Sequence, residues 1–208
     1  MNTVTKVLNQ LFEDIEHQPG SETTQIASTA NTYEKIATYL KPLLPNDGTV
    51  LDYGAGLGLG SGIMQKVLGR SITIHAYEPS PRRVQPTFTQ PSQIVDQYDA
   101  VICLNVLNVL EPELRDKVVK HLLSRVAPNG RAIIGTRTWS GDVAMTKSGE
   151  PAEEPRAIWL TRGGTRVYQK GFEKPELVEY IRKLSSGKFD VSPVSGIAKA
   201  AVVAVRKD

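Results

Sequence analysis

The sequence predicts an α/β protein with a mostly parallel sheet, and three observations carry that prediction. Short stretches rich in apolar and β-branched residues recur at 49–51, 71–77 and 100–104, as expected for buried parallel strands. Segments with helical apolar spacing lie between them, so helices should cover both faces of the sheet. Four glycines at every second position follow the first of these strands. The 208 residues suit one domain of this class.

The N-terminal part predicts a helical cap over residues 1–45. An apolar stripe at helical spacing predicts a helix from Val4 to Ile15, and a second mostly helical stretch runs from Thr24 to Leu44. Tyr33 lies on the apolar face of this second stretch. We expect the cap to pack on a core formed by residues 46–208, so that the chain is one structural domain.

The stretch from Val50 to Ser61 predicts a strand, a glycine loop and a helix, in that order. Glycines let the backbone adopt positive φ and pass closely under a ligand, and the amides that open the helix point back at the loop. The dinucleotide fingerprint fails, because Leu59 or Ser61 stands where its third glycine belongs. Asp52 precedes the first glycine instead, and a carboxylate there would pair with an ammonium group.

A second acidic residue, Glu78, ends the next strand. Adjacent parallel strands would bring Asp52 and Glu78 to the same edge of the sheet, where a carboxylate can accept hydrogen bonds from both hydroxyls of a ribose. The segment that follows contains prolines at 79, 81, 86 and 91, which make a long helix improbable. We therefore expect a shortened connection there, with a minimal strand at 87–89.

The remaining elements follow from their patterns and turn residues. The sequence predicts an amphipathic helix at 112–126, a turn at 128–130, a strand at 131–136, a hairpin joined by 161–165, a helix at 174–184 and two final strands at 189–197 and 200–205. The irregular loop and the hairpin together span 138–171.

These motifs resemble the class I S-adenosylmethionine-dependent methyltransferase superfamily, including small phage-type members of unassigned substrate. The resemblance runs from about residue 50 to 137 and is carried by Asp52-x-Gly-x-Gly-x-Gly, Glu78, the strand that opens at Asp99, and the Pro-x-Gly before the strand at 131. It implies a Rossmann-like sheet with an antiparallel final strand. The run from Asn105 to Asn108 lacks the prolines and aromatic residue of adenine-N6 and cytosine-N4 DNA methyltransferases, which argues against those enzymes.

The resemblance also implies a cofactor and a site. S-adenosyl-L-methionine would bind at the glycine loop and leave as S-adenosyl-L-homocysteine. The implied cofactor-binding residues are Asp52, Gly54, Ala55, Gly56, Gly58, Glu78, Pro79, Gln90, Asn105 and Val106. The segment 138–171 would wall the acceptor pocket, and the candidates on that side are Tyr33, Asn108, Trp139, Asp142 and Arg156. No residue stands out as a general base, so the catalytic residue is left open.

The methyl acceptor is also left open by the sequence. Residues 111–208 hold 18 Lys and Arg against 12 Asp and Glu, whereas residues 1–110 hold 7 against 10. Solvated surfaces explain such a basic half most simply, but it also suits a nucleic-acid acceptor such as RNA or modified DNA. A third hypothesis is a regulatory module that binds the cofactor without turnover.

Other features of the sequence bear on where the protein is located and on whether it binds metals or membranes. No apolar run approaches the roughly 20 residues of a membrane span, and the N-terminus shows no secretory signal. Cys103 is the single cysteine, and His17, His75 and His121 show no ligand spacing. We therefore expect a cytoplasmic protein with neither a metal site nor a membrane partner, and the oligomeric state is left open.

Overall fold

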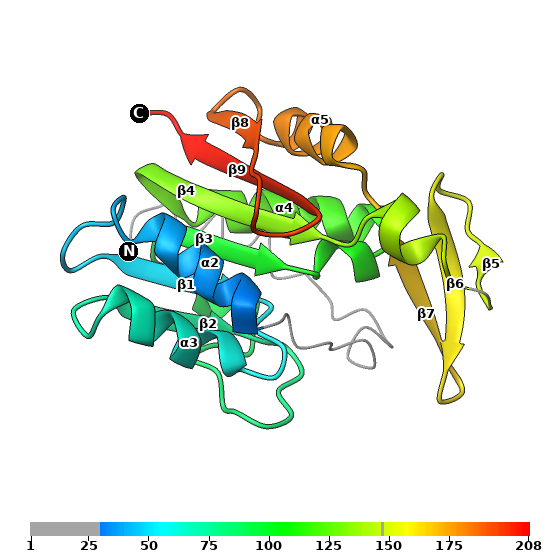
Figure 1. Ribbon diagram of the computed structural model, residues 1–208, viewed down its shortest axis with the longest axis horizontal. Coiled ribbons are helices and arrows are strands. Elements are labelled where there is room, and N and C mark those ends of the chain that lie inside the picture. The colour runs from blue at the N-terminus through cyan, green and yellow to red at the C-terminus, as the bar shows by residue number, and fades with distance from the viewer. Residues whose placement is uncertain (1–29, 147) are drawn as a thin grey trace.

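The computed structural model describes residues 30–146 and 148–208, and its centre is a six-stranded sheet (Figure 1). The helix expected from Val4 to Ile15 lies outside the described residues. The strands of the central sheet are β1 (Thr49–Tyr53), β2 (Thr73–Tyr77), β3 (Tyr98–Leu104), β4 (Val126–Thr136), β8 (Phe189–Pro193) and β9 (Ala200–Arg206).

The strand order is β2-β1-β3-β4-β9-β8. The pairs among β1 to β4 are parallel, and β9 runs antiparallel to both of its neighbours. This confirms the predicted mostly parallel sheet with an antiparallel final strand. In a sheet covered on both faces, strands are buried throughout, and β3 is apolar and buried over most of its length for this reason.

Helices cover both faces of the sheet. On one face lie α2 (Ala30–Leu40) and α3 (Leu59–Leu68), where Ile36 and Met64 pack with Val50 and Ile102. The other face is covered by α4 (Pro112–Ser124) and α5 (Lys174–Leu184). The predicted helix at 174–184 is confirmed at both ends. A capping box formed by Glu173 and Glu176 fixes its start.

The shortened connection after β2 is also confirmed. The strand expected at 87–89 is a single parallel bridge between Tyr77 and Phe88. Phe88 N–H donates to the Ala76 carbonyl (2.9 Å), and Glu78 N–H donates to the Phe88 carbonyl (3.1 Å). A short 3₁₀ turn, η2 (Pro91–Gln93), then leads to β3. The outer edge of β2 is therefore covered by this loop at the carboxyl end of the strand.

The prediction that a turn at 128–130 precedes the strand is wrong, because β4 already begins at Val126 and runs through these residues. The chain bulges there instead, with Asn129 at φ 59° and a shift in the register between β3 and β4. Gly130 lies so close to β3 that a Cβ would come within 3.0 Å of the carbonyl oxygens of Tyr98 and Asp99. The Pro-Asn-Gly signal thus marks a bulge within a strand.

A separate three-stranded sheet stands beyond the carboxyl ends of β3 and β4 (Figure 1). It consists of β5 (Glu150–Pro151), β6 (Ala157–Arg162) and β7 (Thr165–Lys170). β6 and β7 form the predicted hairpin, and Gly163 and Gly164 at its turn both have positive φ, as a tight two-residue turn requires. Two short turns, η3 (Leu107–Val109) and η4 (Trp139–Val143), connect this sheet region to the core.

Among residues 30–146 and 148–208, none of the helices combines the length and the apolar character that a bilayer crossing demands.

Candidate functional site

The glycine loop between β1 and α3 has the open, tight conformation that the sequence predicts. Gly54, Gly56 and Gly58 have φ of 80°, 58° and 73°, a region that side chains make costly. The amides of Gly54 and Ala55 donate to the carbonyl of Tyr77 at 2.8 and 2.9 Å, which ties the loop to the end of β2. Apart from Gly56 and its two neighbours in the chain, no atom of the described residues lies within 4 Å of the position that a Cβ on Gly56 would occupy. The loop is therefore free on that side to receive a ligand.

Asp52 lies beneath this loop as a buried carboxylate. Its side chain is almost fully buried, and its Oδ1 accepts a hydrogen bond from the Tyr33 hydroxyl at 3.3 Å. Its Oδ2 has no hydrogen-bond partner among the described residues. Burial raises the pKa of Asp52 to about 7; the Tyr33 hydrogen bond opposes this shift, and the charge of Glu78 adds to it. A buried carboxylate in this state gains from a nearby cation, which fits an ammonium group.

Tyr33 and Gly60 hold that carboxylate in place. A Cβ on Gly60 would lie 2.3 Å from the Tyr33 ring and 2.8 Å from Asp52 Oδ2, so this position on α3 has to be glycine for Tyr33 to reach Asp52. The sequence suggested Tyr33 for the acceptor side. The structure instead places its hydroxyl on Asp52, beneath the glycine loop.

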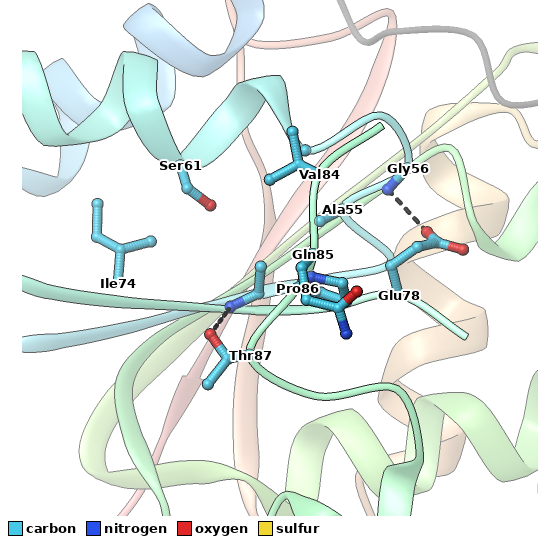
Figure 2. A pocket seen from close by; sticks show the side chains of 11 residues that line it. Ala55, Gly56, Ser61, Ile74, Glu78, Val84, Gln85, Pro86 and Thr87 are labelled. Atoms are coloured by element: carbon cyan, nitrogen blue, oxygen red, sulfur yellow. Dashed lines mark hydrogen bonds between the residues drawn. The ribbon is translucent and has the colours of Figure 1, made fainter. Parts of the chain in front are cut away.

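Glu78 follows β2 and contacts the loop from the other side. Its Oε2 accepts a hydrogen bond from the Gly56 amide at 2.8 Å (Figure 2). Its Oε1 accepts one from the Ser80 amide at 3.1 Å. Because β1 and β2 pair in register, Asp52 and Glu78 lie at the same edge of the sheet, as predicted. A carboxylate oxygen accepts more than one hydrogen bond, so these contacts leave capacity for ribose hydroxyls.

A cavity of about 150 Å³ adjoins Glu78 and the glycine loop (Figure 2). Its wall comes from the loop, the start of α3, the outer edge of β2 and the segment after Glu78; the lining residues are Ala55, Gly56, Gly58, Ser61, Ile74, Ala76, Glu78, Val84, Gln85, Pro86 and Thr87. Thr87 Oγ1 accepts from the Ala76 amide at 3.1 Å and fastens this segment to β2. The sequence did not reveal the wall at 84–87, since that segment has no periodic pattern.

Asn105 and Val106 lie at the same edge, at the end of β3. The Asn105 amide donates to the Gly135 carbonyl at 2.8 Å, and Asn105 has φ 57°, a conformation that non-glycine residues adopt mainly at turns and functional sites. A Cβ on Gly54 would lie 2.3 Å from the Val106 side chain. The structure thus brings Val106 against the glycine loop, with Asn105 next to it in the chain, and their contact with the cofactor stays a prediction.

Two further cofactor candidates lie on the loop after β2. Pro79 is exposed. Gln90 is exposed too, and its side chain takes part in the capping box that opens η2, together with Gln93. Contact of Pro79 or Gln90 with a cofactor stays a prediction.

The acceptor-side candidates have separate surroundings. Asn108, in η3, is 2% exposed, and its Oδ1 has no hydrogen-bond partner among the described residues. Trp139 opens η4 and packs with Val143, Ile158 and Leu160 against the hairpin. Arg156 forms an ion pair with Glu176 of α5 at 2.9 Å. Of these, Asn108 has the polar atom most in need of a partner.

Asp142 has both carboxylate oxygens engaged. Its Oδ2 accepts from the amide and the hydroxyl of Thr138, each at 3.1 Å, and its Oδ1 forms an ion pair with Lys199 at 2.9 Å. Partial burial would raise its pKa, but the hydrogen bonds from Lys199 and Thr138 outweigh this and lower it. A carboxylate with a lowered pKa is a weak base, so Asp142 is placed to fix the turn η4.

The fold and this geometry together define a class of protein. A glycine loop with a buried acid beneath it, a second acid at the end of the neighbouring strand, and an antiparallel strand inserted next to the last parallel strand form a Rossmann-like methyltransferase core. A family model described as a methyltransferase domain matches residues 26–166. This match covers more than half of the chain, and the protein belongs to that methyltransferase family.

Solved structures share the fold at low sequence identity. The sugar N-methyltransferase KedS8 from Streptoalloteichus sp. aligns with a TM-score of 0.58 and 12% identity, over 88% of each chain. The Burkholderia thailandensis 1,6-didemethyltoxoflavin-N1-methyltransferase, solved with its substrate and S-adenosylhomocysteine, aligns at 0.54 and 16%, over 99% of this chain and 88% of that one. CalS10, an amino pentose methyltransferase from Micromonospora echinaspora bound to S-adenosylmethionine, aligns at 0.52 and 13%, over 92% and 100%. A search of curated proteins finds no match.

Proposed function

We propose that this methyltransferase transfers the methyl group of S-adenosyl-L-methionine to a small-molecule acceptor bound between the glycine loop and the hairpin β6–β7. The observation that carries the cofactor assignment is the buried Asp52, whose Oδ2 has no hydrogen-bond partner among the described residues beneath an open glycine loop. An ammonium group would stabilise the ionised form of such a carboxylate and donate a hydrogen bond to it.

The residues of this chain bind and orient the cofactor. Asp52 accepts from the ammonium group, directly or through a water molecule. The backbone from Gly54 to Gly58 passes under the methionine part, and Glu78 accepts from the ribose hydroxyls while holding the loop through the Gly56 amide. Asn105 and Val106 border the same space from β3.

The reaction is an in-line displacement. The cofactor supplies a methyl group on a positively charged sulfur; the C–S bond breaks as the acceptor atom forms its bond to carbon, and the sulfur keeps the electron pair and becomes neutral. Charge is dispersed as the reaction proceeds, so the protein contributes mainly by aligning the acceptor and excluding water.

The surroundings favour an acceptor that needs no strong base. Asp142, the carboxylate that the sequence offered near the acceptor, is engaged by Thr138 and Lys199. A neutral amine is nucleophilic as it stands and loses its proton to water after attack, so it suits such a site. The relatives KedS8 and the toxoflavin enzyme are N-methyltransferases of small molecules, which supports the same acceptor class.

Methyl transfer from radiolabelled S-adenosylmethionine tests this proposal. The purified protein is incubated with a metabolite extract filtered to retain only small molecules and, separately, with total RNA and DNA. We expect label in the small-molecule fraction, and Glu78→Ala to lower its incorporation. Label confined to polynucleotide would instead support a nucleic-acid acceptor, and its binding would then weaken steeply with added salt.

A further inference from the structure

Most basic side chains around the hairpin have an acidic partner. Arg115 pairs with Glu154 at 2.6 Å and Lys170 with Glu176 at 2.6 Å, and further pairs join Arg156 to Glu176, Arg166 to Glu150 and Lys199 to Asp142. These pairs engage five of the basic side chains of the C-terminal half. Among the described residues of this region, Arg162 on β6 and Arg137 at the end of β4 form no ion pair.

Arg137 is the less exposed of these two arginines. It directly follows β4 and is half-buried, yet no carboxylate within the described part of the chain pairs with it. Its Nη1 donates a hydrogen bond to the amide oxygen of Gln169 at 3.4 Å, which is long. Gln169 itself is 2% exposed, on β7. A guanidinium held by a neutral amide keeps its full charge for another partner.

The position of Arg137 is on the acceptor side. Its carbonyl accepts from the Phe172 amide at 3.0 Å, so it lies beside the strand that leaves the hairpin. Strand β4 is separated from the glycine-loop strand β1 by β3, which puts the two strand ends about 10 Å apart at ordinary strand spacing. Arg137 thus lies at the same edge of the sheet as the glycine loop and beside the hairpin.

A second polar group borders this region independently. Turn η3 packs against β7, and Asn108 within it is buried, with an Oδ1 that has no partner among the described residues. A buried amide oxygen without a donor costs stability unless a ligand or water supplies one. The region where η3 and the end of β4 meet β7 therefore combines a cation, an amide that can donate, and an oxygen that needs a donor.

We infer that Arg137, together with Gln169, recognises an anionic group, a carboxylate or a phosphoryl group, on the methyl acceptor. This inference rests on the proposed function and narrows its substrate class. The guanidinium binds two oxygens of such a group at once, and the Gln169 amide nitrogen donates to it while its oxygen holds the guanidinium. Arg137 is then a specificity-determining residue that touches substrate at a distance from the reacting atoms.

The test measures anion and cofactor binding separately. Benzoate and inorganic phosphate are titrated by NMR into ¹⁵N-labelled wild-type protein, Arg137→Gln and Arg166→Gln, with and without S-adenosylhomocysteine. The control changes an exposed arginine of the same hairpin that already has an acidic partner. We expect one of the two anions to bind the wild type and the control alike, and Arg137→Gln about tenfold more weakly.

The preferred anion distinguishes a carboxylate-bearing acceptor from a phosphorylated one. S-adenosylhomocysteine should bind all three proteins equally. A loss of S-adenosylhomocysteine affinity in Arg137→Gln would assign the arginine to the carboxylate of the cofactor and overturn the inference. Equal anion binding in Arg137→Gln, or none in the wild type, would overturn it too. Failure of the wild type to bind S-adenosylhomocysteine would contradict the proposed function. The anion titrations done without S-adenosylhomocysteine would still decide the role of Arg137.

Discussion

Asp52 is central to the proposed site, because we expect its ionisation to control both ligand binding and stability. In the ligand-free protein, burial brings its pKa to about 7. The ionised form is the one that binds an ammonium group, so cofactor binding should release a proton and improve as the pH rises.

Cofactor affinity should therefore depend on pH around neutrality. With a pKa of about 7, the ionised fraction of Asp52 falls roughly tenfold between pH 8 and pH 6, and the affinity for S-adenosylhomocysteine should fall by about the same factor. Calorimetry at the two pH values measures this change. Above pH 8 the affinity should level off, and an affinity that improves on acidification would contradict the ionised role of Asp52.

The substitution Asp52→Asn should separate stability from binding. The folded pKa lies above the ordinary value of 3.8, so Asp52 favours folding at low pH and loses that contribution as the pH rises toward 7. By pH 8 the loss reaches at most about 4 kcal/mol. The asparagine side chain carries no charge but keeps an oxygen for the Tyr33 hydroxyl, so the variant should melt at a higher temperature at pH 8.

The same variant should bind S-adenosylhomocysteine at least about tenfold more weakly and lose the pH dependence. Thermal melts with and without ligand measure the change in stability, and calorimetry measures the change in affinity. Unchanged affinity for S-adenosylhomocysteine in Asp52→Asn would show that Asp52 does not contact the cofactor.

Gly60 and Gly62 offer a matched pair on the same helix. A Cβ on Gly60 would lie 2.3 Å from the Tyr33 ring, whereas a Cβ on Gly62 would meet no described atom within 4 Å. Gly60→Ala should therefore displace Tyr33 and lower stability by about 1–3 kcal/mol, with a loss of cofactor affinity. Gly62→Ala should stabilise the helix by roughly 0.5–1 kcal/mol and leave binding unchanged. Urea denaturation and ligand titration compare the two, and equal behaviour would refute the packing argument.

At the level of elements, the hairpin β6–β7 is anchored to the core by buried charge. Arg115 of α4 is 2% exposed, and its guanidinium donates to Glu154, which also accepts from the Tyr168 hydroxyl of β7. The guanidinium also lies over the rings of Phe172 and Tyr180 at 5.2 and 5.3 Å. This contact network fixes the hairpin against α4 and α5.

Replacing one partner of a buried ion pair leaves the other charge without compensation. We expect Arg115→Met to lower the free energy of unfolding by about 3–5 kcal/mol. Arg166→Met is the matched control, because its pair with Glu150 is exposed on both sides, and its loss should cost below about 1 kcal/mol. Denaturant titration measures both variants. A loss in Arg115→Met as small as in the control would show that the hairpin is held mainly by apolar packing.

The elements themselves could be predicted largely from local patterns. Apolar periodicity and proline or glycine punctuation predicted β1, the helix at 174–184, the hairpin and the shortened link after β2, because those signals lie within short windows. The turn at 128–130 was misread, since whether Asn129 and Gly130 end a strand or bulge within it depends on how closely β3 approaches.

Residues of the site were predictable where a motif fixes them. Asp52, the glycines and Glu78 could be located because their positions follow from the ends of adjacent strands. The contact of Tyr33 with Asp52 was not predicted, and Arg137 was not singled out, because their partners, Asp52 and Gln169, come from elements distant in the sequence. A cation directly after a predicted strand at the ligand edge was the one signal that pointed to Arg137.

For the whole molecule, the order of the strands determines where the site lies, and the ion pairs determine where charge is engaged around it. The order β2-β1-β3-β4-β9-β8 gathers the glycine loop, both acids and Asn105 at one edge, and the hairpin faces that edge from beyond the strand ends (Figure 1). Several basic side chains of the C-terminal half are engaged in ion pairs around the hairpin. This arrangement is compatible with the small-molecule acceptor proposed above.

The central claim is that S-adenosylmethionine binds at Asp52 and Glu78, and isothermal titration calorimetry tests it most directly. The wild type should bind S-adenosylmethionine at pH 8 with a dissociation constant on the order of 1 µM to 1 mM, the usual range for substrates of enzymes. Glu78→Ala should bind at least about tenfold more weakly. No heat of binding from the wild type at millimolar ligand, or an unchanged affinity in Glu78→Ala, would contradict the account.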